Sequence, residues 1–235
     1  LYLVPDASAV ITMGGQDAAI YLLTHRDGQW YLKSFAMNGP CAAGTGSFID
    51  QQAERLSSFL YDENVSFCQE HISEILANFI ARGQDSTSAA PVACRCTVFT
   101  KSDMIHLQNK GEPLANIIAG LHQGNAANYI STIVANQEVT APVVFIGGVA
   151  SNQLQMEAFR RYFPDLIVPP HHTSLGALGA ALFARSEETR SRPDLSALET
   201  MADETASDFP MALPLELRKT TFTDNVVIPA RKQVP

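Results

Sequence analysis

Two cysteines stand where a thiol is readily converted into a metal ligand. Cys41 and Cys96 each precede an expected helix, in the stretches GPCAAGTGSFIDQQA and CRCTVFTKSDMIHLQ. The free N–H groups and positive dipole end of a helix N-terminus lower the pKa of a nearby thiol and favour the thiolate, which binds iron or zinc. Two such helix ends would stabilise an anionic iron–sulfur cluster. Two buried structural cysteines are the alternative, and the spacing alone does not decide between the two interpretations.

The other two cysteines add no convincing ligand set. Cys68 lies on an amphipathic stretch and is expected to be a core residue. The separation of Cys41 from Cys96 by more than fifty residues matches no zinc-finger signature, and Cys94-x-Cys96 alone is weak evidence for a zinc site. A four-iron cluster normally takes four thiolates. A chain that supplies two, Cys41 and Cys96, would complete the set at the axis of a two-fold dimer, so the cluster interpretation predicts obligatory pairing.

Three glycine-rich segments could bind phosphate. Two are Gly-Gly turns after apolar runs, in ITMGGQD and VFIGGVASN, and the third is the loop AAGTGS. Glycine allows close approach of a backbone to a ligand, and strand ends that feed turns are where open sheets bind nucleotides. Ordinary tight turns are the alternative. The chain has neither a Walker lysine nor Gly-x-Gly-x-x-Gly, so P-loop and Rossmann sites are not expected. The candidate positions are Gly14, Gly15, Gly44, Thr45, Gly46, Gly147 and Gly148.

The hydrophobic pattern that must position these residues predicts an α/β fold with a mixed sheet, flanking helices and a helical insertion. Asp27-Gly28 is a strong hairpin signal between the second and third strands. The apolar small-residue helix at the end of this region could pack tightly on the sheet. The expected strands are 9–13, 18–25, 29–37, 142–146 and 165–170, and the expected helices are 47–60, 66–81, 97–110, 113–134, 153–162 and 174–186.

The overall composition and charge of the chain argue against several classes of protein. The chain has 235 residues, 46% of them hydrophobic, and a net charge of −8, which gives no reason to expect a nucleic acid or an anionic membrane as partner. No apolar run approaches the roughly 20 residues of a membrane span, the N-terminus has no signal-peptide pattern, and four cysteines are too few for a secreted disulfide framework, so a cytoplasmic location is expected. The chain starts at Leu1 and is expected to be a fragment of something larger. After residue 186 the composition turns acidic and polar, so residues 187–235 are expected to be a linker or the start of a following unit.

Four stretches together resemble one protein family. MNGPCAAGTGSFIDQQAERL, CTVFTKSDMIHLQNKG, VVFIGGVASN and SLGALGAALFA are similar, in this order, to the BadF/BadG/BcrA/BcrD ATPases, which activate 2-hydroxyacyl-CoA dehydratases or serve as ATPase subunits of benzoyl-CoA reductase. The resemblance runs from about residue 9 to residue 185 and looks closest to the long, multidomain members. It implies a ribonuclease-H-like lobe of the actin, sugar kinase and Hsp70 superfamily. Residues 1–186 would be the second ATPase lobe, with the first lobe absent.

The resemblance also implies a mechanism. Cys41 and Cys96 would hold a [4Fe–4S] cluster shared by two protomers, and ATP with Mg²⁺ would drive the transfer of one low-potential electron to a dehydratase or reductase partner. The first Gly-Gly turn would correspond to the second phosphate motif and the other to the adenosine motif. Gln16 and Asp17 would position magnesium-bound water.

Two positions depart from the family pattern and put full ATPase competence in doubt. Thr12 stands where members usually carry an acidic residue, and Ala19 where they often carry lysine. Two alternatives therefore remain beside the activator. One is a sugar-kinase-like phosphotransferase, for which no carboxylate base stands out. The other is a non-catalytic lobe that binds a nucleotide or a protein partner.

Overall fold

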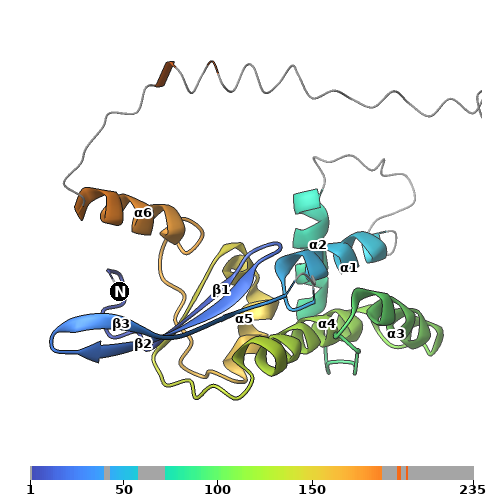
Figure 1. The fold of residues 1–235 in the computed structure, drawn as a ribbon. Coiled ribbons are helices and arrows are strands. Elements are labelled where there is room, and N and C mark those ends of the chain that lie inside the picture. Colours follow the sequence, from blue (N-terminus) through green and yellow to red (C-terminus); the bar gives the residue numbers. More distant parts are fainter. Residues whose placement is uncertain (1, 40–42, 58–71, 187–194, 197–199, 201–235) are drawn as a thin grey trace, which may run out of the picture. The chain divides into compact units, whose positions relative to one another are not determined.

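The structure is a computed structural model that describes residues 2–39, 43–57, 72–186, 195, 196 and 200 (Figure 1). The chain divides into two compact units, residues 1–186 and residues 187–235. All candidate site residues named above belong to the first unit. Cys41 and Cys68, however, lie outside the described residues.

A four-stranded mixed sheet of order β3-β2-β1-β4 organises the first unit. β1 (Ala9–Met13), β2 (Ala18–Arg26) and β3 (Gln29–Met37) are antiparallel neighbours, and β4 (Val143–Ile146) lies parallel to β1. Asp27 and Gly28 connect β2 to β3 with φ angles of 52° and 76°, the left-handed pair that a two-residue hairpin turn requires. The expected hairpin and the mixed sheet are both confirmed.

One face of the sheet carries the main core. Alternate residues of β1 are buried completely, and α4 (Leu114–Tyr129) and α5 (Gln153–Arg160) cover them. This period-two burial is what a strand with one covered face produces. The largest fully buried side chains of this core are Ile11, Met13, Ile20, Tyr129, Phe145 and Phe159.

A second core lies on the other side of α4. The helices α1 (Gly46–Leu56), α2 (Ile72–Gln84) and α3 (Thr97–Asn109) pack around α4, which contributes Ile117, Ile118 and Leu121 to this core. Because α4 also contacts α5, which packs with it on the sheet, it connects the sheet layer to the helical insertion (Figure 1). The expected helical insertion is therefore confirmed.

Two expected elements differ from the structure. The helix expected to run to residue 134 ends at Tyr129 and continues as one π-turn, Ile130–Val134, in which the Ala135 N–H bonds to the Ile130 carbonyl at 2.8 Å. The expected strand 165–170 is reduced to a single bridge between Ile167 and Val144. The prolines that follow this bridge, at positions 169 and 170, have no N–H to donate to a ladder.

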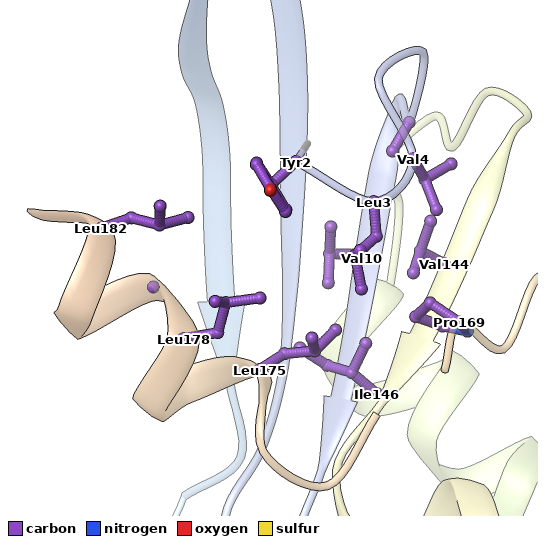
Figure 2. Close-up of a pocket in the computed structure, with 12 residues that line it drawn as sticks. Tyr2, Leu3, Val4, Val10, Val144, Ile146, Pro169, Leu175, Leu178 and Leu182 are labelled. Atoms are coloured by element: carbon purple, nitrogen blue, oxygen red, sulfur yellow. The ribbon is translucent and has the colours of Figure 1, made fainter. Parts of the chain in front are cut away.

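The small-residue composition of α6 (Leu175–Ser186) would allow it to pack tightly on the sheet. The structure differs, because none of the residues of this helix is buried. An apolar cavity of about 260 Å³ remains between this helix and the strands. Figure 2 shows Leu175 and Leu178 directed towards Val10 and Ile146 on the face opposite the main core. No described helix has the length and apolar character that crossing a membrane requires.

Candidate nucleotide and metal site

The two Gly-Gly turns lie at the same edge of the sheet. Parallel strands have their carboxyl ends on one side, and β1 and β4 are parallel neighbours, so Gly14-Gly15 and Gly147-Gly148 come together there. Gly147 has a φ of +98°, and a Cβ at this position would collide with the Met13 carbonyl. Only glycine fits between the two strand ends.

The third glycine segment meets the first turn through backbone hydrogen bonds. At the start of α1, the Gly46 N–H donates to the Gly14 carbonyl at 2.9 Å and the Ser47 N–H donates to the Gly15 carbonyl at 2.7 Å. A Cβ on Gly46 would lie 2.8 Å from the Gly14 oxygen. The expectation that the first amides of α1 are free to face a metal cluster is therefore wrong for these two, because the adjacent turn supplies their acceptors.

The three segments enclose a cavity of about 260 Å³, called here the glycine cavity. Gly15, Gly46 and Gly148 contribute to its lining, and its other walls are apolar except for three polar side chains. The remaining candidates Gly14, Gly44, Thr45 and Gly147 do not line it. The lining residues are Gly15, Gly46, Ile49, Asp50, Leu76, Ile80, Gly148, Val149, Ser151 and Asn152.

Asp50, which the sequence did not single out, is the only charged residue among those that line the glycine cavity. Burial raises the pKa of this carboxyl above its ordinary value, and the nearby Glu54 raises it further. A carboxylate in this position would gain from a ligand that donates hydrogen bonds.

A buried polar network anchors the loop in front of α1. The Gly44 N–H donates to the Asn125 side-chain oxygen at 3.0 Å, and the Asn125 amide donates to the Thr45 carbonyl at 3.3 Å and to the Gln155 side chain at 3.2 Å. Thr45, Asn125 and Gln155 are completely buried. Buried amides are costly unless satisfied, so these bonds fix the loop firmly on α4.

The network continues to the wall of the glycine cavity through His122. Gln155 donates to the His122 carbonyl at 3.3 Å, and the Asn152 amide lies 3.0 Å from His122 Nε2. His122 Nδ1 lies 2.8 Å from the Ile118 carbonyl, which requires the Nδ1–H tautomer and leaves Nε2 as an acceptor. Complete burial lowers the pKa of His122 to about 4, against the opposing effect of the Ile118 bond. The ring is neutral at physiological pH, as this network requires.

Cys96 occupies the N-cap position of α3, where its side chain makes no capping bond, and it is half-buried. The local backbone is held by Thr100, whose hydroxyl donates to the Ala93 carbonyl at 2.6 Å and lies 2.9 Å from the Cys96 carbonyl. The thiol is thus at a helix N-terminus, as expected. Val98 and Phe99, which follow it, are 66% and 68% exposed.

Cys94 is a core residue. Its sulfur lies 3.8 Å from the Leu121 carbonyl of α4, and Gly124 leaves space for it, because a Cβ at position 124 would collide with the sulfur. Burial raises the pKa of the Cys94 thiol to about 12. Leu121, Gly124 and Asn125 span little more than one helical turn. The loop before α3 and the loop before α1 therefore pack on the same part of α4.

The structure does not complete a metal site. Cys41 lies outside the described residues, and within the described residues no group of three or more His, Cys, Asp or Glu side chains is placed to hold a metal ion. Cys96, half-exposed and without a capping bond, fits a ligand role. Assignment of both cysteines to a cluster stays a prediction.

Gln16 and Asp17 are exposed and do not line the glycine cavity. Their backbone shapes the turn: the Asp17 carbonyl accepts from the Gly14 N–H at 2.8 Å, and the Gln16 carbonyl accepts from Asn38 at 2.9 Å. The departures Thr12 and Ala19 are direct cross-strand partners. An acidic and a basic residue at these positions would form an opposite-charge pair, whereas this chain has a neutral one.

Comparison of the amino-acid sequence with known proteins identifies relatives of this chain. Residues 1–184 match the BadF/BadG/BcrA/BcrD ATPase family. The chain is 32% identical over 195 residues to the 2-hydroxyisocaproyl-CoA dehydratase activator of Clostridioides difficile, covering 83% of this chain and 66% of the relative. It is 34% identical over 184 residues to the activator of lactoyl-CoA dehydratase of Anaerotignum propionicum, covering 78% and 63%. The chain thus spans just under two thirds of these relatives.

Comparison of the fold with solved structures leads to the same group of proteins. The crystal structure of the activator of 2-hydroxyisocaproyl-CoA dehydratase from Clostridium difficile, solved with bound ADPNP, matches with a TM-score of 0.63 at 30% identity, covering 81% of this chain and 67% of that one. The α/β class expected from the sequence, a mixed sheet with flanking helices of the actin-like ATPase and sugar kinase fold, is confirmed.

Proposed function

The chain belongs to the BadF/BadG/BcrA/BcrD ATPase family, and we propose that it is the second lobe of an ATP-dependent activator. In this proposal the whole protein transfers one low-potential electron to a 2-hydroxyacyl-CoA dehydratase or a related reductase. The observation that carries it is the pair of backbone bonds from Gly46 and Ser47 to the first Gly-Gly turn, because they join a nucleotide-type turn to a cysteine-bearing loop.

ATP with Mg²⁺ would bind in the glycine cavity. The phosphates would lie against the first Gly-Gly turn, at Gly15, and the adenosine against the second, at Gly148; both residues line the cavity. The matching Clostridium difficile activator contains ADPNP, a nucleotide with three phosphorus groups like ATP, and this supports the assignment. Gln16 and Asp17 would act on magnesium-bound water from the edge of the site.

Cys41 and Cys96 would each supply a thiolate to a [4Fe–4S] cluster, and a second protomer would supply the other two. When bound, such a cluster would carry one electron from an external low-potential donor to the acceptor protein. The chain's part is to hold the cluster and to change its surroundings with nucleotide state. A cytoplasmic location, expected from the sequence, remains a prediction.

Nucleotide would act on the cluster through α1. A shift of the Gly14-Gly15 turn must move the first amides of α1 or break two hydrogen bonds of 2.9 and 2.7 Å. The loop that leads back to Cys41 is held by the same helix end and by Asn125. A nucleotide that binds two arrangements of the turn with different affinity would therefore bias two arrangements of this loop.

Anaerobic reconstitution with iron and sulfide, followed by iron and absorbance measurements, tests the cluster assignment. The chain should bind about two irons per protomer, half of a shared four-iron cluster. Cys41→Ser and Cys96→Ser should each abolish binding, whereas the control Cys94→Ala, at the buried neighbouring thiol, should keep it. Iron-free wild-type protein, or full iron in Cys96→Ser, would contradict the proposal.

A lobe that binds nucleotide without hydrolysing it is the second candidate. The neutral Thr12–Ala19 pair and the position of Gln16 and Asp17 outside the cavity favour it. Under this alternative Mg-ATP binds but is not turned over, with or without a reduced cluster. A measured ATPase rate that falls on Asp17→Asn would favour the activator instead. No observation here favours a sugar-kinase-like phosphotransferase.

A further inference from the structure

The cavity of about 260 Å³ between α6 and the strands β1 and β4 is called here the α6 cavity. Three leucines of α6 line one side of it, and three branched residues of the strands line the other (Figure 2). The N-terminal residues 2–4 also contribute to its lining. It shares no lining residue with the glycine cavity. The six wall residues are Leu175, Leu178, Leu182, Val10, Val144 and Ile146.

The lining of the α6 cavity suits neither water nor a charged group. Among its lining residues, the only polar side-chain atom is the hydroxyl oxygen of Tyr2, and no side chain is charged. A buried water needs about two to four polar partners, and an apolar cavity without them stays dry. An empty cavity leaves its lining without van der Waals contacts and so lowers the stability of the fold. The chemistry of the lining therefore favours an apolar occupant.

The start of α6 is tied to the second Gly-Gly turn. The His172 carbonyl accepts from the Gly147 N–H at 2.9 Å, and His172 Nε2 lies 2.8 Å from Ser151 Oγ. The leucines of α6 that line the cavity are only half-buried, because the helix does not reach the strands. A collapse of α6 onto the sheet would strain the two bonds of His172. A ligand that fills the space needs no such change.

We propose that the α6 cavity binds a neutral hydrocarbon group, an alkyl chain of about ten carbon atoms. A cavity of about 150 Å³ holds a benzene ring, so a volume of about 260 Å³ corresponds to about ten carbons. A charged head group would stay outside, because no lining side chain offers a charge to compensate for its burial. This inference goes beyond the proposed function and does not depend on nucleotide or cluster binding.

Calorimetry with linear alkanols from hexanol to dodecanol, on the protein at its full natural length, tests the size and character of the site. Affinity should rise roughly fourfold with each added CH₂ group, because each one removes further apolar surface from water. The rise should stop at about ten carbons, when the cavity is full. Decanoate at neutral pH should bind no more tightly than decanol, since no cation lines the cavity.

Two glycines of α6 supply a matched pair of variants. Gly179 lines the cavity and a Cβ there meets no atom within 4 Å, so the side chain of Gly179→Leu can enter the space. The affinity for decanol should fall roughly tenfold or more. Gly176 is equally open but does not line the cavity, so Gly176→Leu should keep the affinity within about twofold. Both variants make the same exchange on the same helix.

A second filling variant acts from the sheet. Val10→Phe enlarges a lining side chain of β1 and should also weaken decanol binding, and thermal unfolding shows whether each variant is folded. Binding that is lost in Gly179→Leu and Val10→Phe and kept in Gly176→Leu supports the inference. Wild-type protein that binds no alkanol, an affinity independent of chain length, or equal binding by the two glycine variants overturns it.

Discussion

Two helix N-termini preceded by cysteine-bearing loops are built in different ways. The N-terminus of α1 is buried, and its first two amides bond to the first Gly-Gly turn while Asn125 holds the loop before it. The N-terminus of α3 is half-exposed and is held by bonds among residues 93–103 and by one side chain of α1. The first lies beside the glycine cavity, and the second is held mainly by bonds within its own segment.

This difference suggests that the two loops respond differently to a change in the Gly14-Gly15 turn. A change in the Gly14-Gly15 turn reaches the α1 loop through two backbone bonds, whereas the α3 loop is linked to α1 by the exposed Arg55 guanidinium, 3.2 Å from the Thr97 carbonyl, and by the packing of both loops on α4. If Cys41 and Cys96 share a cluster, one ligand loop would follow nucleotide state and the other would stay fixed. Relative motion of the two ligand loops would then change the surroundings of the cluster.

Of the changes considered, Gly46→Ala should disrupt the contact between the start of α1 and the first Gly-Gly turn most severely. The new Cβ would lie 2.7 Å from Val149 and 2.8 Å from the Gly14 carbonyl, so the backbone must shift. We expect a loss of about 3 kcal/mol in the free energy of unfolding, measured by urea denaturation, together with weakened ATP binding. Gly176→Ala, where a Cβ meets nothing within 4 Å, should change stability by less than about 0.5 kcal/mol. Equal effects of the two changes would show that the α1 contact is not tight.

Acidification should weaken the network behind the α1 loop. The pKa of His122 is lowered to about 4 in the folded protein, against 6.5 ordinarily. The unfolded chain therefore binds a proton first as the pH falls, and this contribution to stability is complete above pH 6.5 and is lost between pH 6.5 and about 4. The loss is on the order of 3 kcal/mol.

The control for this pH effect is His122→Asn. It removes the titrating ring, so its free energy of unfolding, lower at neutral pH, should fall less steeply over the same pH interval. A slope identical to that of wild type would mean that carboxylates, and not His122, set the acid sensitivity.

Arg55→Ala should have the smallest effect and should act on the α3 side. It removes an exposed bond to the Thr97 carbonyl and a part-buried bond of 2.9 Å to the side chain of Gln52, which is fully buried. Stability should fall by about 1 kcal/mol, while amide exchange at the start of α3 becomes faster. A large loss of nucleotide binding in this variant would contradict the proposed independence of the two helix ends.

Local signals in the sequence predicted the elements well. Asp27-Gly28 specified its hairpin because the turn needs two positive φ angles in succession, and the segment after Cys96 forms the helix expected there, which ends just before Gly111. The two apolar strands that end in Gly-Gly marked both turns as candidate ligand sites, and the parallel pairing of β1 and β4 places these turns at one edge of the sheet. These features depend on neighbours in the chain or on simple topology.

The contacts that join the segments could not be predicted in the same way. Gly44 and its acceptor Asn125 are 81 residues apart, and nothing in either local pattern names the other. His122, Asn125 and Gln155 were visible only as polar residues on buried helix faces. Asp50 was missed because a single acidic residue on an amphipathic helix is ordinarily on the solvent side. That the first amides of α1 bond to the Gly-Gly turn follows from tertiary packing alone.

Hydrogen exchange with and without Mg-ATP tests the central claim most directly. The account predicts that nucleotide slows exchange at Gly46 and Ser47 by roughly fivefold or more, since their acceptors belong to the turn that would bind phosphate. Exchange at Thr97 and Val98, at the start of α3, should change by less than about twofold. Equal changes at both helix ends, or no change at Gly46 and Ser47 while ATP is bound, would contradict it.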